Sequence, residues 1–142
     1  MLPGSYVSAE SALGFHRWIP ESVHTVLSVT HGGKSIAYEH EQLGKFEFRR
    51  MTTNTGYFLQ SVARRELQQQ AALVAEPLRA LLDLVYLRKI EWQGIDFLTS
   101  GLRIDEQQLH TVTGLEISRL MTVYKGKRER AFLAELQRAL GL

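Results

Sequence analysis

The sequence predicts an α+β fold, with a small antiparallel sheet in the first half packed with helices and a helix-rich second half. Three runs within residues 23–51 are β-branched or alternate apolar and polar residues, as half-buried strands do. After Pro77 the apolar residues recur at helical spacing. A length of 142 residues, with 44% hydrophobic and 23% charged residues, fits one globular domain. We therefore expect a single domain over residues 1–142, strand-rich over 1–75 and helical over 76–142.

Composition excludes several classes of protein. The chain has no cysteine, which rules out disulfides and thiolate metal sites. Its N-terminus lacks the basic and then apolar pattern of a signal peptide. The longest apolar run, at residues 80–87, contains Asp83 and is far shorter than the roughly 20 residues that a membrane span needs. These features predict a soluble, cytoplasmic protein with no membrane partner.

The first predicted element is a helix that starts almost at the N-terminus. Ser8 is placed to cap this helix, and Glu10 puts a negative charge in its first turn, where exposed N–H groups favour one. Pro20 ends the helical pattern, because proline disfavours a helical conformation in the residue before it.

The strands of the first half are predicted next. Residues 23–30 and 36–41 are rich in β-branched and aromatic residues, and Gly32 and Gly33 between them suit the positive φ angles of a tight turn. We expect these two strands to pair as a hairpin. Residues 45–51 alternate phenylalanine with charged residues and predict a third strand.

The second half is predicted to be helical. Residues 52–70 fit either a loop and helix or a loop and irregular strand. Pro77 suits the first position of a helix, and the apolar residues after it cover more than one face, so this helix should be the most buried. Further helices are expected at residues 105–112, 115–124 and 127–140.

The sequence offers little sign of catalytic or cofactor chemistry. Residues 31–35 read HGGKS and resemble the end of a phosphate-binding loop, but Ser28 stands where the first glycine is required and a strand follows. A hairpin turn is the favoured interpretation. The five histidines lack the spacing of metal ligands. No metal, cofactor or catalytic residue is therefore predicted.

Asp83 is the most unusual carboxylate because it lies within an apolar helical run. Burial of an unpaired carboxylate is costly, so we expect a structural ion pair or cap, with Arg79 one turn earlier as the candidate partner. A catalytic role is the alternative. No second acidic residue is placed by spacing to form a general acid/base pair with it.

Basic residues gather at positions 49–50, 64–65, 88–89 and, most densely, 124–130, and the first and last of these stretches hold the candidate contacts to nucleic acid. Phosphate contacts need only positive charge on an exposed surface. The alternative is a solvated helix start, with Glu129 and Glu135 offsetting part of the charge. The candidate residues are Arg49, Arg50, Lys125, Lys127, Arg128 and Arg130.

A string of short segments in a fixed order resembles the C-terminal domain of AbiEi-type antitoxins, the antitoxins of type IV toxin–antitoxin systems. The matching segments are SYVS at 5–8, ESAL at 10–13, IPE at 19–21, SVT at 28–30, GKF at 44–46 ahead of Arg49, AEP at 75–77, RALLDL at 79–84 and YLR at 86–88. The resemblance is dense up to residue 89 and thins after Trp92. Leu78 and Glu76 depart from the family, which commonly has an acidic residue and a threonine-like cap there.

The resemblance implies a non-enzymatic protein of viral defence that counteracts a nucleotidyltransferase-like toxin by binding. Direct contact with that toxin is left open. Full-length members of the family carry a winged helix before this domain, so the opening segment is expected to correspond to the middle of a longer protein. Without a recognition helix, any contact with DNA should be weak and insensitive to sequence.

Two other classes of function stay open. One is a small nucleic-acid-processing enzyme of the nuclease kind, and the other is a sequence-independent nucleic-acid-binding module. The lack of paired carboxylates or a phosphate-binding loop favours the antitoxin interpretation over the enzyme. The oligomeric state is not predicted.

Overall fold

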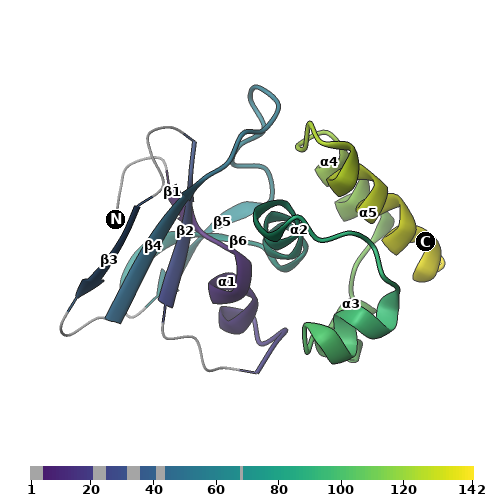
Figure 1. Ribbon diagram of the computed structural model, residues 1–142, viewed down its shortest axis with the longest axis horizontal. Helices are drawn as coiled ribbons and strands as arrows, with labels where there is room; N and C mark the ends of the chain where they lie inside the picture. The colour runs from purple at the N-terminus through teal and green to yellow at the C-terminus, as the bar shows by residue number, and fades with distance from the viewer. Residues whose placement is uncertain (1–4, 21–24, 32–35, 41–43, 68) are drawn as a thin grey trace.

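The computed structural model describes residues 5–20, 25–31, 36–40, 44–67 and 69–142, which form a sheet and a group of helices (Figure 1). The strands are β1 (Ser5–Val7), β2 (Thr25–Thr30), β3 (Ile36–His40), β4 (Gly44–Arg50), β5 (Val62–Leu67) and β6 (Gln70–Ala75). The helices are α1 (Ala9–Phe15), α2 (Pro77–Arg88), the π-helix η1 (Phe97–Gly101), α3 (Glu106–Leu109), α4 (Gly114–Met121) and α5 (Lys127–Ala139).

The α+β class is confirmed, but the sheet is larger and more mixed than the sequence predicts. Within the described residues six strands form one sheet in the order β3-β4-β2-β1-β6-β5. β1 pairs antiparallel with β2, as do β3 with β4 and β5 with β6. β1 pairs parallel with β6, and β2 pairs parallel with β4. The parallel pairs depend on connections that leave the sheet and return, which local patterns do not reveal.

The predicted hairpin between residues 23–30 and 36–41 is wrong. β4 lies between the two strands, so that Val29 of β2 faces Arg49 of β4, and Ile36 of β3 faces Phe48 of β4. β2 is an interior strand whose two edges are satisfied by β1 and β4, which leaves no edge for β3. The turn predicted at Gly32 and Gly33 lies outside the described residues.

The helix predicted near the N-terminus is α1, with Ser8 at its N-cap position. The Ser8 hydroxyl makes no capping hydrogen bond, so the predicted capping role is wrong. This hydroxyl instead donates to the Asp83 carboxylate at 2.7 Å. Glu10 lies in the first turn, as predicted, and pairs with Arg88 of α2 at 2.6 Å.

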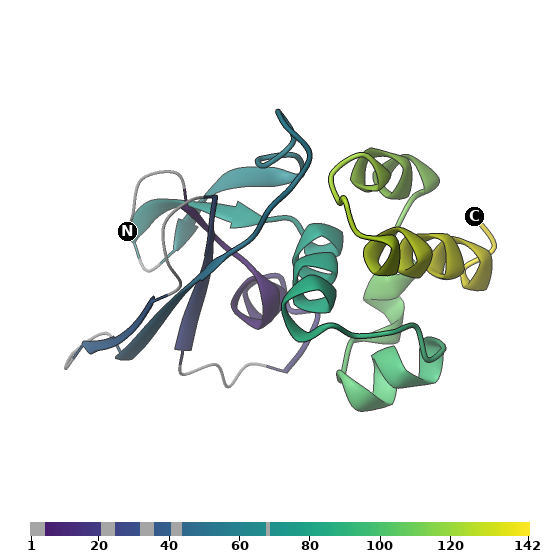
Figure 2. The same ribbon diagram turned by 45° about the horizontal axis from the view of Figure 1, so that its top comes forward.

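α2 is the central element of the molecule. It begins at Pro77, as predicted, and every residue from 78 to 85 is buried. Figures 1 and 2 show why: α2 lies between the sheet with α1 on one side and α4 with α5 on the other. A helix packed on opposite sides has no broad face left for solvent, which explains the apolar residues around its circumference.

The later helices follow the sequence more closely than the strands do. α3 and α4 begin after Asp105 and Thr113, whose side chains accept hydrogen bonds from backbone N–H groups in the first turn. α3 is shorter than the helix predicted over residues 105–112. Of the ambiguous residues 52–70, those that the structure describes form a loop, β5 and the first residue of β6. The π-helix η1 was not predicted.

One apolar core runs through both halves of the described chain. Buried side chains from β1, α1, β2, β6 and α2 join those of α4 and α5 in a single cluster. The largest fully buried apolar members include Leu13, Met51, Leu81, Leu82, Leu98, Leu109 and Phe132. None of the helices in the described ranges combines the length and the hydropathy that a membrane crossing requires.

Candidate functional site

Asp83 lies at the centre of a buried group of polar side chains. Its Oδ1 accepts hydrogen bonds from Arg79 Nε at 3.0 Å and from the Tyr124 hydroxyl at 2.8 Å. Its Oδ2 accepts from the hydroxyls of Tyr6 at 2.6 Å and Ser8 at 2.7 Å. Four of these residues are 0% exposed and Tyr124 is 1% exposed. We call these five side chains the Asp83 cluster.

The Asp83 cluster gathers residues from three distant parts of the chain. Tyr6 lies in β1 and Ser8 follows it, 77 and 75 residues before Asp83. Arg79 and Asp83 are one turn apart in α2 and share a face. Tyr124 comes from the segment between α4 and α5. The cluster therefore ties the sheet, α2 and the C-terminal helices to one carboxylate.

Every acceptor position of the Asp83 carboxylate is used. An ionised carboxylate has about four lone-pair sites, and four donors surround this one. Among the described residues, no buried side-chain nitrogen or oxygen lacks a hydrogen-bond partner. The ion pair predicted between Arg79 and Asp83 is confirmed. Complete pairing is the condition under which a buried charge is tolerated.

The two phenols and the guanidinium of the cluster have shifted pKa values. Burial raises the pKa of the Tyr6 phenol well above its usual value, and the negative charge of Asp83 raises it further. The pKa of Tyr124 is raised for the same two reasons. Burial opposes the charge of Arg79, but Asp83 and the two tyrosines outweigh this effect and raise the pKa of the guanidinium. Both phenols therefore stay protonated and the arginine stays charged at physiological pH.

Arg79 also extends beyond the cluster to a surface loop. Its Nη2 donates to the Tyr6 hydroxyl at 2.7 Å, which orients that phenol. Its Nη1 donates to the backbone carbonyl of Gln60 at 2.7 Å and makes a longer contact, 3.5 Å, with the carbonyl of Tyr57. The rigid fork of the guanidinium thus connects the buried carboxylate to the loop. We call residues 57–61 the 57–61 loop.

The 57–61 loop is held in a defined shape by further hydrogen bonds. The backbone N–H of Gln60 donates to the carbonyl of Tyr57 at 3.1 Å, and that of Glu76 donates to the carbonyl of Ser61 at 2.8 Å. The ring of Phe58 turns inward and lies 5.1 Å from the ring of Tyr6. The loop is consequently anchored to the Asp83 cluster by both its backbone and one of its aromatic rings.

Two apolar side chains of the 57–61 loop face solvent. Tyr57 is 41% exposed and Leu59 is 49% exposed. The loop between β4 and β5 rises above the sheet in Figure 1 and in the turned view of Figure 2. Rigid aromatic and aliphatic side chains on a loop of fixed shape are typical of protein contact surfaces, because little conformational entropy is lost on binding.

The candidate basic residues of the first stretch lie at the end of β4. Arg49 pairs with Glu47 at 3.2 Å, and both side chains are partly exposed. Arg50 is exposed. The chain that follows is fastened to the α4–α5 segment, because the Asn54 side chain donates to the carbonyl of Thr122 at 2.8 Å.

The last basic stretch surrounds the start of α5. Lys125 and Lys127 are exposed. Arg128 pairs with Glu91 at 2.9 Å. Arg130 points back along its helix, where its Nη2 donates to the carbonyl of Lys125 at 3.3 Å. The structure therefore leaves the two lysines as the more available charges of this stretch.

No protein-family model matches the sequence, and no curated protein is similar enough to count as a match.

Sequence reasoning located the centre of the Asp83 cluster but not its extent. A carboxylate in an apolar run with an arginine four residues earlier is a local signal, and it indicated the ion pair. Tyr6 and Tyr124 give no such signal, since tyrosine is common in cores. Their partnership with Asp83 is set by tertiary packing across 77 and 41 residues.

Proposed function

We propose that this chain is an antitoxin domain of a type IV toxin–antitoxin system, which counteracts a nucleotidyltransferase-like toxin by binding. The observation that carries the proposal is the connection between the closed Asp83 cluster and the exposed 57–61 loop. In this proposal the toxin binds the exposed surface of the 57–61 loop, and the buried Asp83 cluster holds that loop in place.

The resemblance to AbiEi-type antitoxins supports the proposal through the residues that carry it. Two of the matching segments, SYVS at 5–8 and RALLDL at 79–84, supply Tyr6, Ser8, Arg79 and Asp83. These four side chains meet in one buried network. The resemblance therefore falls on the residues that fix the loop.

A closed cluster favours a binding role over a catalytic one. A catalytic group must touch the substrate, and all five side chains of the Asp83 cluster are shielded from solvent. Raised pKa values keep both phenols protonated, so neither is poised to exchange a proton near neutral pH. The exposed Tyr57 and Leu59 supply the apolar anchors that a protein interface needs.

Growth rescue tests the proposal. A nucleotidyltransferase-like toxin of a type IV system is expressed from an inducible promoter, with and without the chain, and any such toxin found encoded beside the chain is the first to be tested. We expect the chain to restore growth, and purified chain and toxin to bind in calorimetry. Absence of rescue overturns the antitoxin assignment, and rescue without measurable binding overturns the contact mechanism.

A matched pair of variants tests the loop. Tyr57→Ala with Leu59→Ala removes both exposed side chains of the 57–61 loop and should weaken toxin binding at least about tenfold. Leu115→Ala is the control, because Leu115 is 60% exposed and lies at the start of α4. Equal binding by both variants shows that the contact surface lies elsewhere.

Nucleic-acid contact is a second candidate function, favoured by the exposed Lys125 and Lys127 at the start of α5. We expect weak, non-specific binding of duplex DNA, with a Kd of roughly 10⁻⁴–10⁻⁶ M at physiological salt. Fluorescence anisotropy with two unrelated duplexes measures it, and Lys125→Glu with Lys127→Glu should weaken both complexes equally. A preference of about a hundredfold for one duplex contradicts this assignment.

A further inference from the structure

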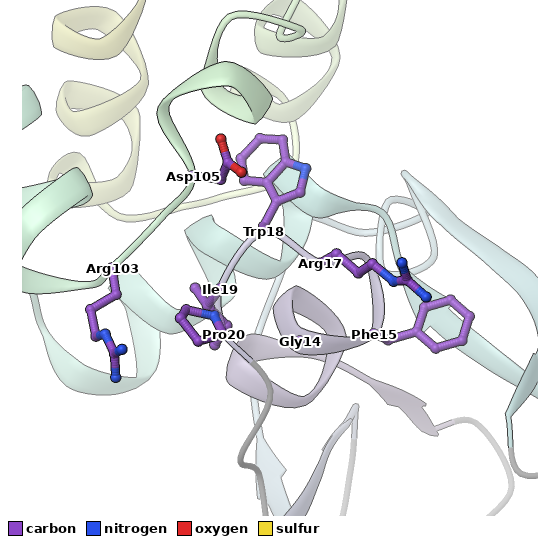
Figure 3. Close-up of a pocket in the computed structure, with 8 residues that line it drawn as sticks. All are labelled: Gly14, Phe15, Arg17, Trp18, Ile19, Pro20, Arg103 and Asp105. Atoms are coloured by element: carbon purple, nitrogen blue, oxygen red, sulfur yellow. The ribbon is translucent and has the colours of Figure 1, made fainter.

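A hollow lies on the surface between the end of α1 and the segment that precedes α3 (Figure 3). Its volume is about 670 Å³, within the roughly 300–1,000 Å³ of small-molecule sites. The hollow is lined by Gly14, Phe15, Arg17, Trp18, Ile19, Pro20, Arg103 and Asp105. None of these residues belongs to the Asp83 cluster or to the 57–61 loop, so the hollow is a separate feature of the molecule.

The rim of the hollow is held by backbone hydrogen bonds. The N–H of Asp105 donates to the carbonyl of Trp18 at 2.7 Å, which joins two segments more than 80 residues apart in sequence. The N–H of Trp18 donates to the carbonyl of Leu13 at 2.9 Å. The Asp105 carboxylate accepts from the N–H of Gln107 at 2.9 Å and is thereby oriented. The hollow is thus formed before any ligand binds, which lowers the entropy cost of binding.

Both arginines of the hollow occupy backbone positions that favour glycine. Arg17 has φ +63° and Arg103 has φ +61°, in the left-handed region. A side chain in this region costs free energy that glycine avoids. Two of the six non-glycine residues with positive φ in the described chain therefore line one hollow. Backbone preference therefore does not explain why arginine occupies these two positions, whereas a role of the side chain in binding would explain it.

The arginines present unused charge. Both are exposed, and neither makes an ion pair or a side-chain hydrogen bond with another described residue. Two arginines against Asp105 give the lining a net charge of +1. Guanidinium groups bind phosphate oxygens through paired N–H donors, so the hollow suits an anionic ligand.

The remaining side chains suit a planar ring. Phe15 is 36% exposed, and Trp18, 4% exposed, forms part of the wall. Figure 3 shows Arg17 on the side of Phe15 and Arg103 on the far side of Ile19 and Pro20. An aromatic ring beside a cation provides a surface on which a base stacks.

We propose that this hollow binds a mononucleotide. Arg17 and Arg103, on opposite sides of Ile19 and Pro20, supply the positive charge that attracts the phosphate, the base lies against Phe15 and the wall formed by Trp18, and the Asp105 carboxylate accepts a hydrogen bond from a hydroxyl or amino group of the ligand. Inorganic phosphate alone would leave the aromatic surface unused, and a nucleoside alone would leave the arginines unused. This site is independent of the proposed toxin contact and goes beyond it.

Tryptophan fluorescence provides a direct test, because the chain has two tryptophans. Trp92 stacks edge-on against Phe132, and Trp92→Phe leaves Trp18 as the sole reporter. This variant is titrated with AMP, adenosine and inorganic phosphate. We expect saturable quenching by AMP with a Kd below about 1 mM and at least about tenfold weaker binding of the other two. Phosphate binding as tight as that of AMP, or no binding of AMP, overturns the proposal.

Glycine substitutions separate ligand binding from folding. Arg17→Gly and Arg103→Gly remove a charge at positions that favour glycine, so the unfolding midpoint should stay level or rise. Each should weaken AMP binding by about tenfold or more. Lys89→Gly is the matched control: Lys89 is an exposed cation with φ +54° at the end of α2, and it does not line the hollow. Unchanged AMP affinity in both arginine variants overturns the assignment of the arginines and the proposed site.

Discussion

Arg79 in α2 and Arg17 after α1 carry the same side chain in opposite surroundings. Arg79 is 0% exposed, and its guanidinium donates to Asp83, Tyr6 and the carbonyl of Gln60. Arg17 is exposed on the rim of the hollow, with no ion pair to another described residue. The N–H donors of Arg79 bind groups inside the protein, whereas those of Arg17 are available to the proposed ligand.

The contrast distinguishes a charge that stabilises the fold, that of Arg79, from a charge that is available to bind a ligand, that of Arg17. Removal of Arg79 or Asp83 from the Asp83 cluster leaves the opposite charge buried without compensation. Removal of Arg17 leaves nothing unpaired in the described structure, so it should affect a ligand and not the fold. Stability and binding should therefore respond to different substitutions, and the following predictions range from the largest expected effect to the smallest.

Asp83→Asn should have the largest effect on stability. The amide is nearly the same size but leaves the Arg79 charge buried without a counter-charge. We expect a loss of roughly 3–5 kcal/mol in the free energy of unfolding, measured by urea titration. Glu135→Gln is the control, since its pair with Arg138 is largely exposed. A loss below about 1 kcal/mol in Asp83→Asn would show that the cluster does not support the fold.

Tyr124→Phe should have an intermediate effect. It removes one donor to Asp83 Oδ1 without changing the charge or leaving a large cavity. We expect a loss of about 1–3 kcal/mol, because a buried acceptor loses a partner. Tyr86→Phe is the matched control: among the described residues its hydroxyl accepts one long contact, 3.5 Å, from the Thr52 N–H. Equal losses in the two variants would show that the hydrogen bond from Tyr124 to Asp83 does not stabilise the fold.

Alkaline pH should weaken the cluster. The pKa values of Tyr6 and Tyr124 are raised in the folded state, whereas an unfolded tyrosine titrates near pH 10. Above about pH 10 the unfolded chain therefore binds fewer protons than the folded chain, so the free energy of unfolding falls as pH rises. Each phenol contributes up to about 1.4 kcal/mol per pH unit. In urea titrations from pH 8 to 11, the free energy of unfolding should fall less steeply with pH in Tyr6→Phe than in the unmodified chain. Identical slopes for the two proteins would be evidence against the raised pKa of Tyr6.

Arg128→Ala should have the smallest effect on stability. Its pair with Glu91 spans 2.9 Å, but Glu91 is 73% exposed and Arg128 is 34% exposed. Exposed ion pairs contribute roughly 0–1 kcal/mol because water competes for both charges. Thermal unfolding should place the loss below about 1 kcal/mol. A loss of stability as large as that of Asp83→Asn would contradict the distinction between the buried ion pair of Arg79 and the exposed ion pair of Arg128.

The parts of the fold that the sequence predicted correctly are set by local chemistry. Pro77 marks the start of α2, because a residue without an N–H fits the first helical position. The helices predicted at residues 105–112 and 115–124 correspond to α3 and α4, and the structure shows that Asp105 and Thr113 cap them. The ion pair of Arg79 and Asp83 is likewise local, one helical turn apart.

The parts that the sequence did not predict depend on tertiary packing. β2 and β3 follow each other in the chain, but β4 is inserted between them in the sheet. Ser8 stands at the N-cap of α1, yet its hydroxyl bonds to Asp83, because a buried carboxylate is the stronger acceptor. The hollow brings Arg17 and Arg103 to one surface from segments with no shared pattern. Such relationships appear only once the chain is folded.

The central claim is that the buried Asp83 cluster fixes the shape of the exposed 57–61 loop. Arg79→Lys tests it most directly, because lysine preserves the charge beside Asp83 but lacks the fork that reaches the Gln60 carbonyl. Amide hydrogen exchange should be at least about tenfold faster at Gln60 and Val62, with the amides of α5 unchanged. Unchanged exchange at Gln60 and Val62 in a folded Arg79→Lys chain would contradict the claim.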